Sequence, residues 1–333
     1  MHLLWCAAGV DHHFEINMSR LLLNFLLVTL IWAIWFGVLG AEQAHSIISR
    51  HFEISLTMLF GSFVAGSTSV GGGAVAFPVF TKLLQIPSDI TLVFSLAIQS
   101  IGMGVASFLI VSTRTPIVLK IILHSFLFGA IGMGIGLFLL GPVLPSADVR
   151  YVFSMFSVIV GVALVVNHRR VKQGIVSELQ DDAQEISARV LFPIALIGGI
   201  LSGLIGTGID FVIFAIMIFL GNYGIRTAIA TSVVVMALNA MIGFLLVALF
   251  TDRFSGVVVE YWLAAIPIVI VGAPLGAIAC RYLPRGFMFY FLMLLITVDV
   301  ISTLVILGFR VPYLAMLALV LLAMIIASRR QSV

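Results

Sequence analysis

The sequence predicts an all-α polytopic membrane protein built from two inverted repeats, with about eight transmembrane helices and two glycine-broken re-entrant hairpins. Three observations predict this fold. Hydrophobic residues make up 62% and charged residues 9% of the 333 positions, against roughly 45–50% and about 25% in soluble domains. Long apolar runs follow one another along the whole chain, and two of them are interrupted by clusters of small residues.

Ten apolar runs are candidate membrane spans, each of which needs about 20 residues. The runs are 21–39, 54–80, 90–111, 117–140, 151–166, 190–220, 227–250, 257–280, 287–307 and 311–327. The first follows a segment that contains His12 and His13, and it is long enough to span, whereas a signal peptide has a shorter apolar core, so we interpret it as a retained helix. Translation can start at Met1 or at Met18.

The only long polar segment separates two similar halves. The resulting division is 1–53 (N-terminal segment and first transmembrane helix), 54–166 (repeat 1), 167–189 (cytoplasmic loop), 190–307 (repeat 2) and 308–333 (last transmembrane helix and cytoplasmic tail). Subtracting 137 carries Gly203 onto Gly66, Gly208 onto Gly71, and Ser232 onto Ser95 without a gap. Both the glycine breaks and the polar motif that follows them coincide, which indicates an internal repeat.

Loop charges favour re-entrant hairpins over ten simple spans. If all ten runs cross the membrane, the 17 Lys and Arg residues divide almost evenly between the two sides. If 54–80 and 190–220 enter and leave on one face, twelve of the 17 gather on the side of both termini and the central loop. Basic loops are cytoplasmic, so this topology predicts cytoplasmic termini, a multi-pass inner-membrane protein and inverted halves, a recurrent transporter plan.

The length of the broken runs agrees with hairpins. Half of a run is about 13 residues, or roughly 20 Å of helix, which passes the midplane of a hydrocarbon core about 30 Å thick. Glycine-broken backbone at that depth must be buried in protein or line a cavity. The alternative is a kinked span in which the glycines allow close helix packing.

The two interruptions and the helices after them carry the candidate substrate-binding residues. A helix N-terminus presents free N–H groups and a partial positive charge, so it can hold an oxyanion without a buried Lys or Arg, and glycine permits close approach. Polar side chains one turn or more apart on the next helix can face the breaks, although they can equally be interhelical hydrogen-bonded contacts. The candidates are Ser67, Thr68, Ser69, Gly71, Gly72, Gly73, Ser95, Gln99, Gly206, Thr207, Gly208, Ser232 and Asn239.

Four of these segments also carry a family resemblance. Gly66 to Pro78, Phe94 to Met103, Gly203 to Asp210 and Ala230 to Asn239 resemble the TauE/SafE sulfite-exporter family, and the resemblance runs from about Ile54 to Leu307. It implies a bacterial-type inner-membrane exporter of sulfite, sulfoacetate, other sulfonates or related small anions. The second half departs from the family pattern, because Gly206-Thr207-Gly208 replaces a triple glycine and Ala215 replaces a proline.

Two acidic residues lie well inside apolar runs, and intramembrane ionisable groups are functional candidates by default. Asp210, beside the second break, can hydrogen-bond the unwound backbone, repel an anion until it is protonated, or bind a coupling proton, and we expect the last of these roles. Asp299 is less well placed, and hydroxyl partners such as Ser302 and Thr303 favour a structural role. His124 can relay a proton, but anchoring of a helix end at the interface is the favoured role.

These features predict a secondary transporter that exports a small sulfur-containing or organic anion by alternating access. Its partners are a small anionic substrate and the lipid bilayer. A homo-oligomer is compatible with the sequence, and nucleic acid binding is not expected. We expect no enzyme activity, no cofactor and no metal site, because catalytic motifs, a nucleotide-binding P-loop and metal-ligand spacings of Cys or His are absent from the sequence. The alternative is a cation- or metal-ion transporter that uses Asp210 and Asp299.

Overall fold

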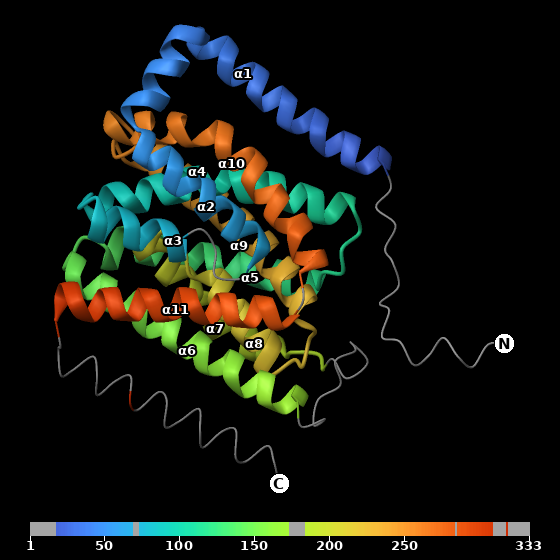
Figure 1. Ribbon diagram of the computed structural model, residues 1–333. Helices are drawn as coiled ribbons and strands as arrows, with labels where there is room; N and C mark the ends of the chain where they lie inside the picture. The colour runs from blue at the N-terminus through green and yellow to red at the C-terminus, as the bar shows by residue number, and fades with distance from the viewer. Residues whose placement is uncertain (1–17, 69–72, 173–183, 284, 309–317, 319–333) are drawn as a thin grey trace.

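The computed structural model describes residues 18–68, 73–172, 184–283, 285–308 and 318, and within these ranges every regular element is helical (Figure 1). This confirms the all-α class. The elements are α1 (Met18–Arg50), α2 (Phe52–Ser67), α3 (Gly73–Pro78), the π-helix η1 (Val79–Leu83), α4 (Ser88–Ser112), α5 (Leu119–Gly134), the π-helix η2 (Ile135–Leu140), α6 (Ser146–Lys172), α7 (Ala188–Ile205), α8 (Ile209–Phe219), α9 (Ile225–Phe250), α10 (Val257–Tyr282) and α11 (Arg285–Leu307).

Six helices in the described part of the chain are long and apolar enough to cross a membrane, which agrees with a multi-pass membrane protein. They are α1, α4, α5 continued by η2, α7, α9 and α10. The predicted spans at 151–166 and 287–307 fall within α6 and α11. The predicted last span at 311–327 lies outside the described residues, so the number of eight spans stays a prediction.

Both predicted interruptions are present as helix breaks at which the chain turns back. α2 ends at Ser67, helix resumes at Gly73, and Figure 1 shows α3 and η1 returning toward the end of the bundle from which α2 starts. A series of ring contacts joins the residue before α2 to η1 along that end, with centroids 5.0, 6.5 and 5.1 Å apart: His51, Tyr261, Phe94 and Phe80.

The second break has the same form. The N–H of Gln184, before α7, donates to the carbonyl of Gly221, after α8, over 2.9 Å, so the two arms begin and end together. α2 has 16 residues and α7 has 18, which corresponds to roughly 24 and 27 Å of helix. The first arms are longer than the expected 13 residues, because each helix starts two residues before its apolar run and continues to the middle of it.

The two halves exchange packing partners, since α2 packs on α10 and α5 packs on α7. Glycine makes both contacts close. A Cβ at Gly66 would lie 1.9 Å from the carbonyl oxygen of Ala273, and one at Gly199 would lie 2.2 Å from that of Gly129. The proposed packing role of glycine thus applies to Gly66 and Gly203, while other glycines of the same clusters form the breaks.

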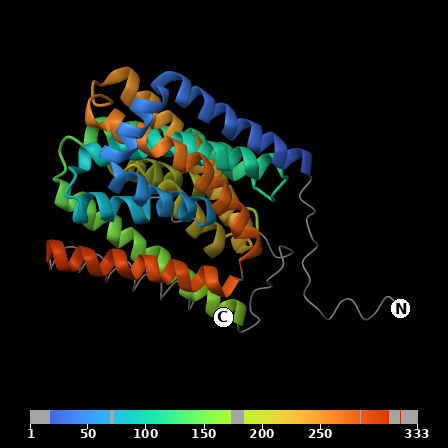
Figure 2. The ribbon, with the colours of Figure 1, turned by 45° about the horizontal axis from the view of Figure 1, so that its top comes forward.

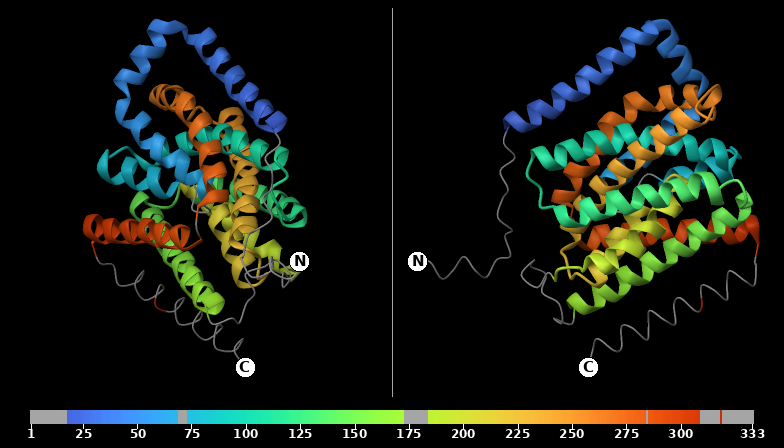
Figure 3. Two further views of the ribbon diagram at one scale, coloured as in Figure 1. Left: turned by 45° about the vertical axis from the view of Figure 1, so that its right-hand side comes forward. Right: turned by 180° about the vertical axis from the view of Figure 1, so that it is seen from behind.

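α1 lies along one edge of the bundle, while α6 and α11 pair along the opposite edge (Figures 2 and 3). The apolar stretch of α1 is mostly exposed, and a non-helical Gly40 divides the helix into two arms. Trp32 and Trp35 hold α1 against α10 by donating from their indole nitrogens to the carbonyls of Pro267 and Leu263, at 3.1 and 3.0 Å. They act as packing residues.

Candidate functional site

The site is the break between α7 and α8, whose backbone shape depends on two glycines. Gly206 ends α7 with φ of 86°, and Gly208 precedes α8 with φ of 141°, and both values favour glycine. Ser202 holds the break from the preceding turn. Its carbonyl accepts from the N–H of Gly206 at 2.8 Å, and its hydroxyl accepts from the N–H of Ile209 at 3.0 Å.

Ser202 was not among the predicted residues. Its role depends on the three-residue gap between two helices, which side-chain periodicity along one helix does not express. The N-cap preference for a hydroxyl does not point to it, because that preference concerns the residue directly before α8, which is Gly208.

Ser95 and Gln99 of α4 reach the break directly. The side-chain amide of Gln99 donates to the Gly206 carbonyl at 2.8 Å and to the Ser95 hydroxyl at 2.6 Å, and that hydroxyl donates to the same carbonyl at 3.2 Å. They satisfy a carbonyl that the end of α7 leaves without a helical partner. The Gln99 Oε1 atom is buried and has no hydrogen-bond partner among the described residues.

Asp210 lies in the first turn of α8 and is 1% exposed. Its Oδ1 accepts from the N–H of Gly208 at 3.0 Å and from the hydroxyl of Thr207 at 3.4 Å. The other oxygen, Oδ2, has no partner among the described residues. The side chain therefore occupies the helix N-terminus at which the sequence suggested that a substrate oxyanion would bind, and an anion there must compete with this carboxylate.

Asn239 of α9 is fully buried, and neither end of its side-chain amide has a hydrogen-bond partner in the described structure. It faces the start of α8, because a Cβ placed at Gly129 of α5 would lie 2.5 Å from Asn239 Nδ2 and 2.4 Å from Ile209 Cδ1. Buried amides are normally paired. Ser125, also on α5 and also fully buried, has an unpaired hydroxyl and was missed by the sequence analysis.

The other predicted residues lie elsewhere or point to their own helix. Ser232 donates to the Ile229 carbonyl at 2.9 Å, and Ser67 and Thr68 donate to that of Val64 at 3.3 and 2.8 Å. Gly73 begins α3. Ser69, Gly71 and Gly72 lie outside the described residues.

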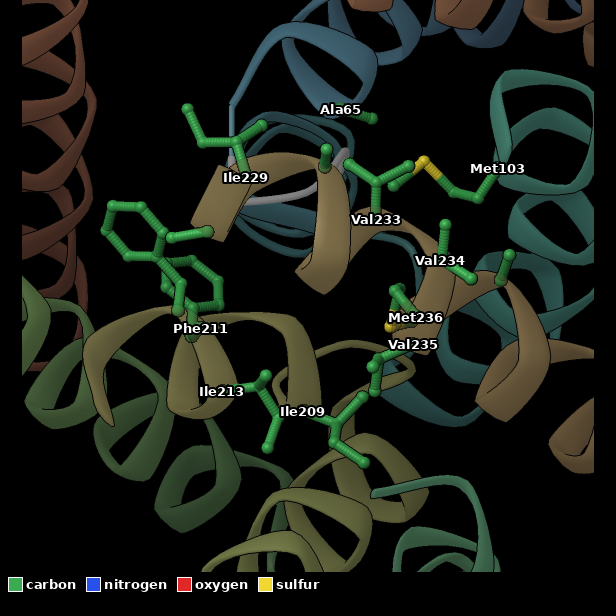
Figure 4. Close-up of a cluster of buried hydrophobic side chains, with 14 of the residues drawn as sticks. Ala65, Met103, Ile209, Phe211, Ile213, Ile229, Val233, Val234, Val235 and Met236 are labelled. Atoms are coloured by element: carbon green, nitrogen blue, oxygen red, sulfur yellow. The ribbon is translucent and has the colours of Figure 1, made fainter. Parts of the chain in front are cut away.

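The segment of α9 from Ile229 to Met236 lies between the two hairpins, with Ala65 of α2 on one side and Ile209 and Ile213 of α8 on the other (Figure 4). These side chains form one apolar cluster. The polar groups of the second break therefore lie against an apolar surface, where a hydrogen bond to a ligand is stronger than in water.

Asp299 pairs with a residue that the sequence placed in an aqueous loop. Its Oδ1 lies 3.2 Å from Nζ of Lys82, and both side chains are buried. Ser302 and Thr303, the expected partners of the carboxylate, donate instead to the Asp299 backbone carbonyl at 2.8 and 2.9 Å. Asp210 and Asp299 thus have separate partners, and within the described residues no three His, Cys, Asp or Glu side chains group as metal ligands.

His124 lies near the start of α5, where Nδ1 donates to the carbonyl of Lys120 at 2.7 Å. The imidazole is partly exposed. This arrangement agrees with a histidine that anchors a helix end.

Comparison with known proteins gave one match. The model of the family described as sulfite exporter TauE/SafE matches residues 54–304, which is more than half of the chain. No curated protein and no solved structure matches significantly.

Proposed function

The chain belongs to the TauE/SafE sulfite exporter family, and we propose that it is a secondary transporter which exports small sulfur-containing anions such as sulfite and sulfoacetate by alternating access. Membership makes it a membrane transporter, and the family is not one of enzymes. The choice among sulfite, sulfonates and other organic anions, and the coupling to protons, rest on the second break.

The observation that carries the proposal is the hydrogen bond that the carboxylate of Asp210 accepts from the N–H of Gly208. When Asp210 is charged, it fills the helix N-terminus and repels another anion. When it is protonated, the N–H of Gly208 and the hydroxyl of Thr207 become donors for a substrate oxyanion at a helix start. Proton binding and anion binding are then coupled at one site, so the anion leaves together with a proton when its outward concentration gradient exceeds the inward proton gradient.

Two unpaired amides complete the site. Asn239 supplies a free N–H donor, and Gln99 keeps a free acceptor because its amide nitrogen is committed to Gly206 and Ser95. A donor and an acceptor together suit an oxyanion that carries one hydroxyl, as the hydrogensulfite ion does. This supports a protonated sulfur oxyanion over a fully deprotonated carboxylate.

The proposed inverted repeats give alternating access a structural basis. Gly66 of α2 packs on Ala273 of α10, and Gly203 of α7 packs on Gly136 of η2. Subtracting 137 from 203 gives 66, and subtracting it from 273 gives 136. The same offset therefore relates both pairs of contacting residues, as expected if each hairpin rocks against the corresponding helix of the other half.

Ion pairs mark the two ends of the bundle. His51 pairs with Glu260 at one end, and Lys120 pairs with Glu185 at the other. The excess of Lys and Arg in the loops at the Lys120 end supports a cytoplasmic location for that end. In this inner-membrane topology the two hairpins enter the membrane from opposite faces. The N-terminus of α1 is then on the cytoplasmic side.

The test is transport of sulfite into proteoliposomes, with and without an imposed pH gradient. We expect saturable uptake that an acidic exterior stimulates in the wild type. Asp210→Asn should keep sulfite counterflow, since an amide resembles the protonated acid, but should lose the stimulation by the pH gradient. Asp252→Asn, in an exposed loop, is the matched control and should behave as wild type.

Two results would contradict the proposal. Unchanged pH stimulation in Asp210→Asn would remove the carboxylate from coupling. Absence of sulfite movement, together with a cation-dependent current that Asp210→Asn abolishes, would establish the cation-transporter alternative.

A further inference from the structure

A second group of buried charges lies between the first hairpin and the α6–α11 pair. Nζ of Lys82 contacts the carboxylate and the carbonyl of Asp299, both at 3.2 Å, and the hydroxyls of Ser302 and Thr303 at 2.8 and 2.7 Å. Thr303 is also hydrogen-bonded to Ser154 of α6. Three hydroxyl groups therefore surround one ion pair.

Lys82 contacts one oxygen of the Asp299 carboxylate, and the hydroxyls of Ser154 and Ser157 on α6 lie beside the same carboxylate. Its Oδ2 atom is buried without a hydrogen-bond partner in the described part of the chain. A carboxylate with one unpaired oxygen gives up less on leaving its site than one whose two oxygens are both fully hydrogen-bonded.

A second cation stands beside this pair. Arg150 of α6 lies one helical turn before Ser154, whose hydroxyl is hydrogen-bonded to Thr303 beside Nζ of Lys82. Its Nε–H is buried and has no partner among the described residues. Two cations and one carboxylate leave a net positive charge, with an unused donor of the kind that binds oxyanions well.

The fold does not require charge at these positions. The 137-residue offset places Phe219 opposite Lys82, Phe287 opposite Arg150, and Val162 opposite Asp299. The other half therefore has apolar residues at all three positions. Apolar residues often replace a buried ion pair without loss of stability, so its presence in one half indicates a role in binding.

We propose that Lys82 and Arg150 form a second binding site for a small oxyanion, and that in this structure the carboxylate of Asp299 takes the place of the anion. An arriving oxyanion competes with Asp299 for Nζ of Lys82 and also accepts from Nε of Arg150. The hydroxyls of Ser154, Ser302 and Thr303 can turn their protons toward it.

The location gives this site a direction. Arg150 precedes Tyr151, whose hydroxyl donates to the carbonyl of Gly308 at 2.7 Å beyond the end of α11. This end of the bundle is opposite to the Lys120–Glu185 pair, so the site lies on the outer, exit side. The inference rests on the proposed function and adds an anion-binding step after the second break.

The test is equilibrium binding of sodium sulfite to the purified full-length protein, measured by titration calorimetry. Lys82→Gln and Arg150→Gln should each weaken binding roughly tenfold or more, as expected for one lost charge-assisted hydrogen bond. Asp299→Asn should tighten it, because it removes the competing anion and keeps the side-chain shape. Arg253→Gln, exposed at the same end, is the matched control and should leave the affinity unchanged.

The opposite changes in sulfite affinity, weaker in Lys82→Gln and tighter in Asp299→Asn, distinguish a binding site from a structural ion pair. If Asp299→Asn and Lys82→Gln both lower thermal stability and neither changes sulfite affinity, the inference is overturned. Arg150→Gln keeps the experiment decisive if Lys82→Gln fails to fold, since Arg150 is partly exposed and outside the ion pair. Sulfite transport by the wild type with unchanged affinity in all three variants would overturn the second site and leave the proposed function intact. Absence of sulfite binding and transport in the wild type would overturn both.

Discussion

Gly206→Ala is the sharpest test of the break between α7 and α8. The φ of 86° at Gly206 is in the left-handed region, which costs a residue with a Cβ about 1–2 kcal/mol. The added methyl would also lie 2.6 Å from Cβ of Ser95 and 3.0 Å from the carbonyl oxygen of Leu92. Overpacking of this kind costs about 1–3 kcal/mol, so the expected loss is about 2–5 kcal/mol in total.

The loss should appear in thermal unfolding of the purified protein in mild detergent, as a melting temperature several degrees below that of the wild type. The substitution also displaces the carbonyl that Gln99 and Ser95 hold, so sulfite counterflow in proteoliposomes should fall with it. Function and stability are thus lost through the same backbone shift.

Gly134→Ala is the control. Gly134 ends α5 where the helix continues into η2, and a Cβ there meets no atom within 4 Å. This substitution should leave the stability unchanged or raise it by about 0.5–1 kcal/mol. If Gly206→Ala has the same melting temperature as Gly134→Ala and transports sulfite normally, the left-handed break and its contact with α4 are refuted.

Two further predictions concern topology and pH. A cysteine at exposed Gln85, which follows the first hairpin, should react with an impermeant maleimide on intact cells, and one at Glu185 only after permeabilisation; reaction of both from one side would contradict the hairpins. Lys120 lowers the pKa of the exposed Glu185 carboxyl by a hydrogen bond and by its charge. The pair's contribution to stability is therefore complete above the ordinary value of 4.5 and disappears as the pH falls through the lowered pKa. The difference in melting temperature between wild type and Glu185→Gln should shrink on acidification, and a difference that grows would refute the pairing.

The helix breaks could be predicted because they are local. Glycines at Gly206 and Gly208 permit backbone angles that other residues rarely adopt, and the residue type alone carries that information. The lengths of the hairpin arms could not be predicted, because α2 and α7 begin at Phe52 and Ala188, before their apolar runs. Helix continues there through residues that hydropathy assigns to loops.

The partners of buried charges could not be predicted either. Lys82 and Asp299 are 217 residues apart, and periodicity assigns a residue to a face of its own helix without saying which helix covers that face. The sequence therefore placed Lys82 in water and gave Asp299 the hydroxyls of its own helix. Gln99 and Asn239 are both buried beside the second break, while their part in substrate binding stays a prediction.

The exchange of packing partners between the halves has a consequence for biogenesis. The glycine surface of α2 is complementary to α10, which the ribosome does not begin to make until it has passed residue 256. α2 must therefore wait in the membrane, or beside an insertase, with its close-packing surface uncovered while most of the chain is synthesised. The first half cannot reach its final form before the second arrives, so premature termination leaves an exposed glycine surface that quality-control proteases can recognise.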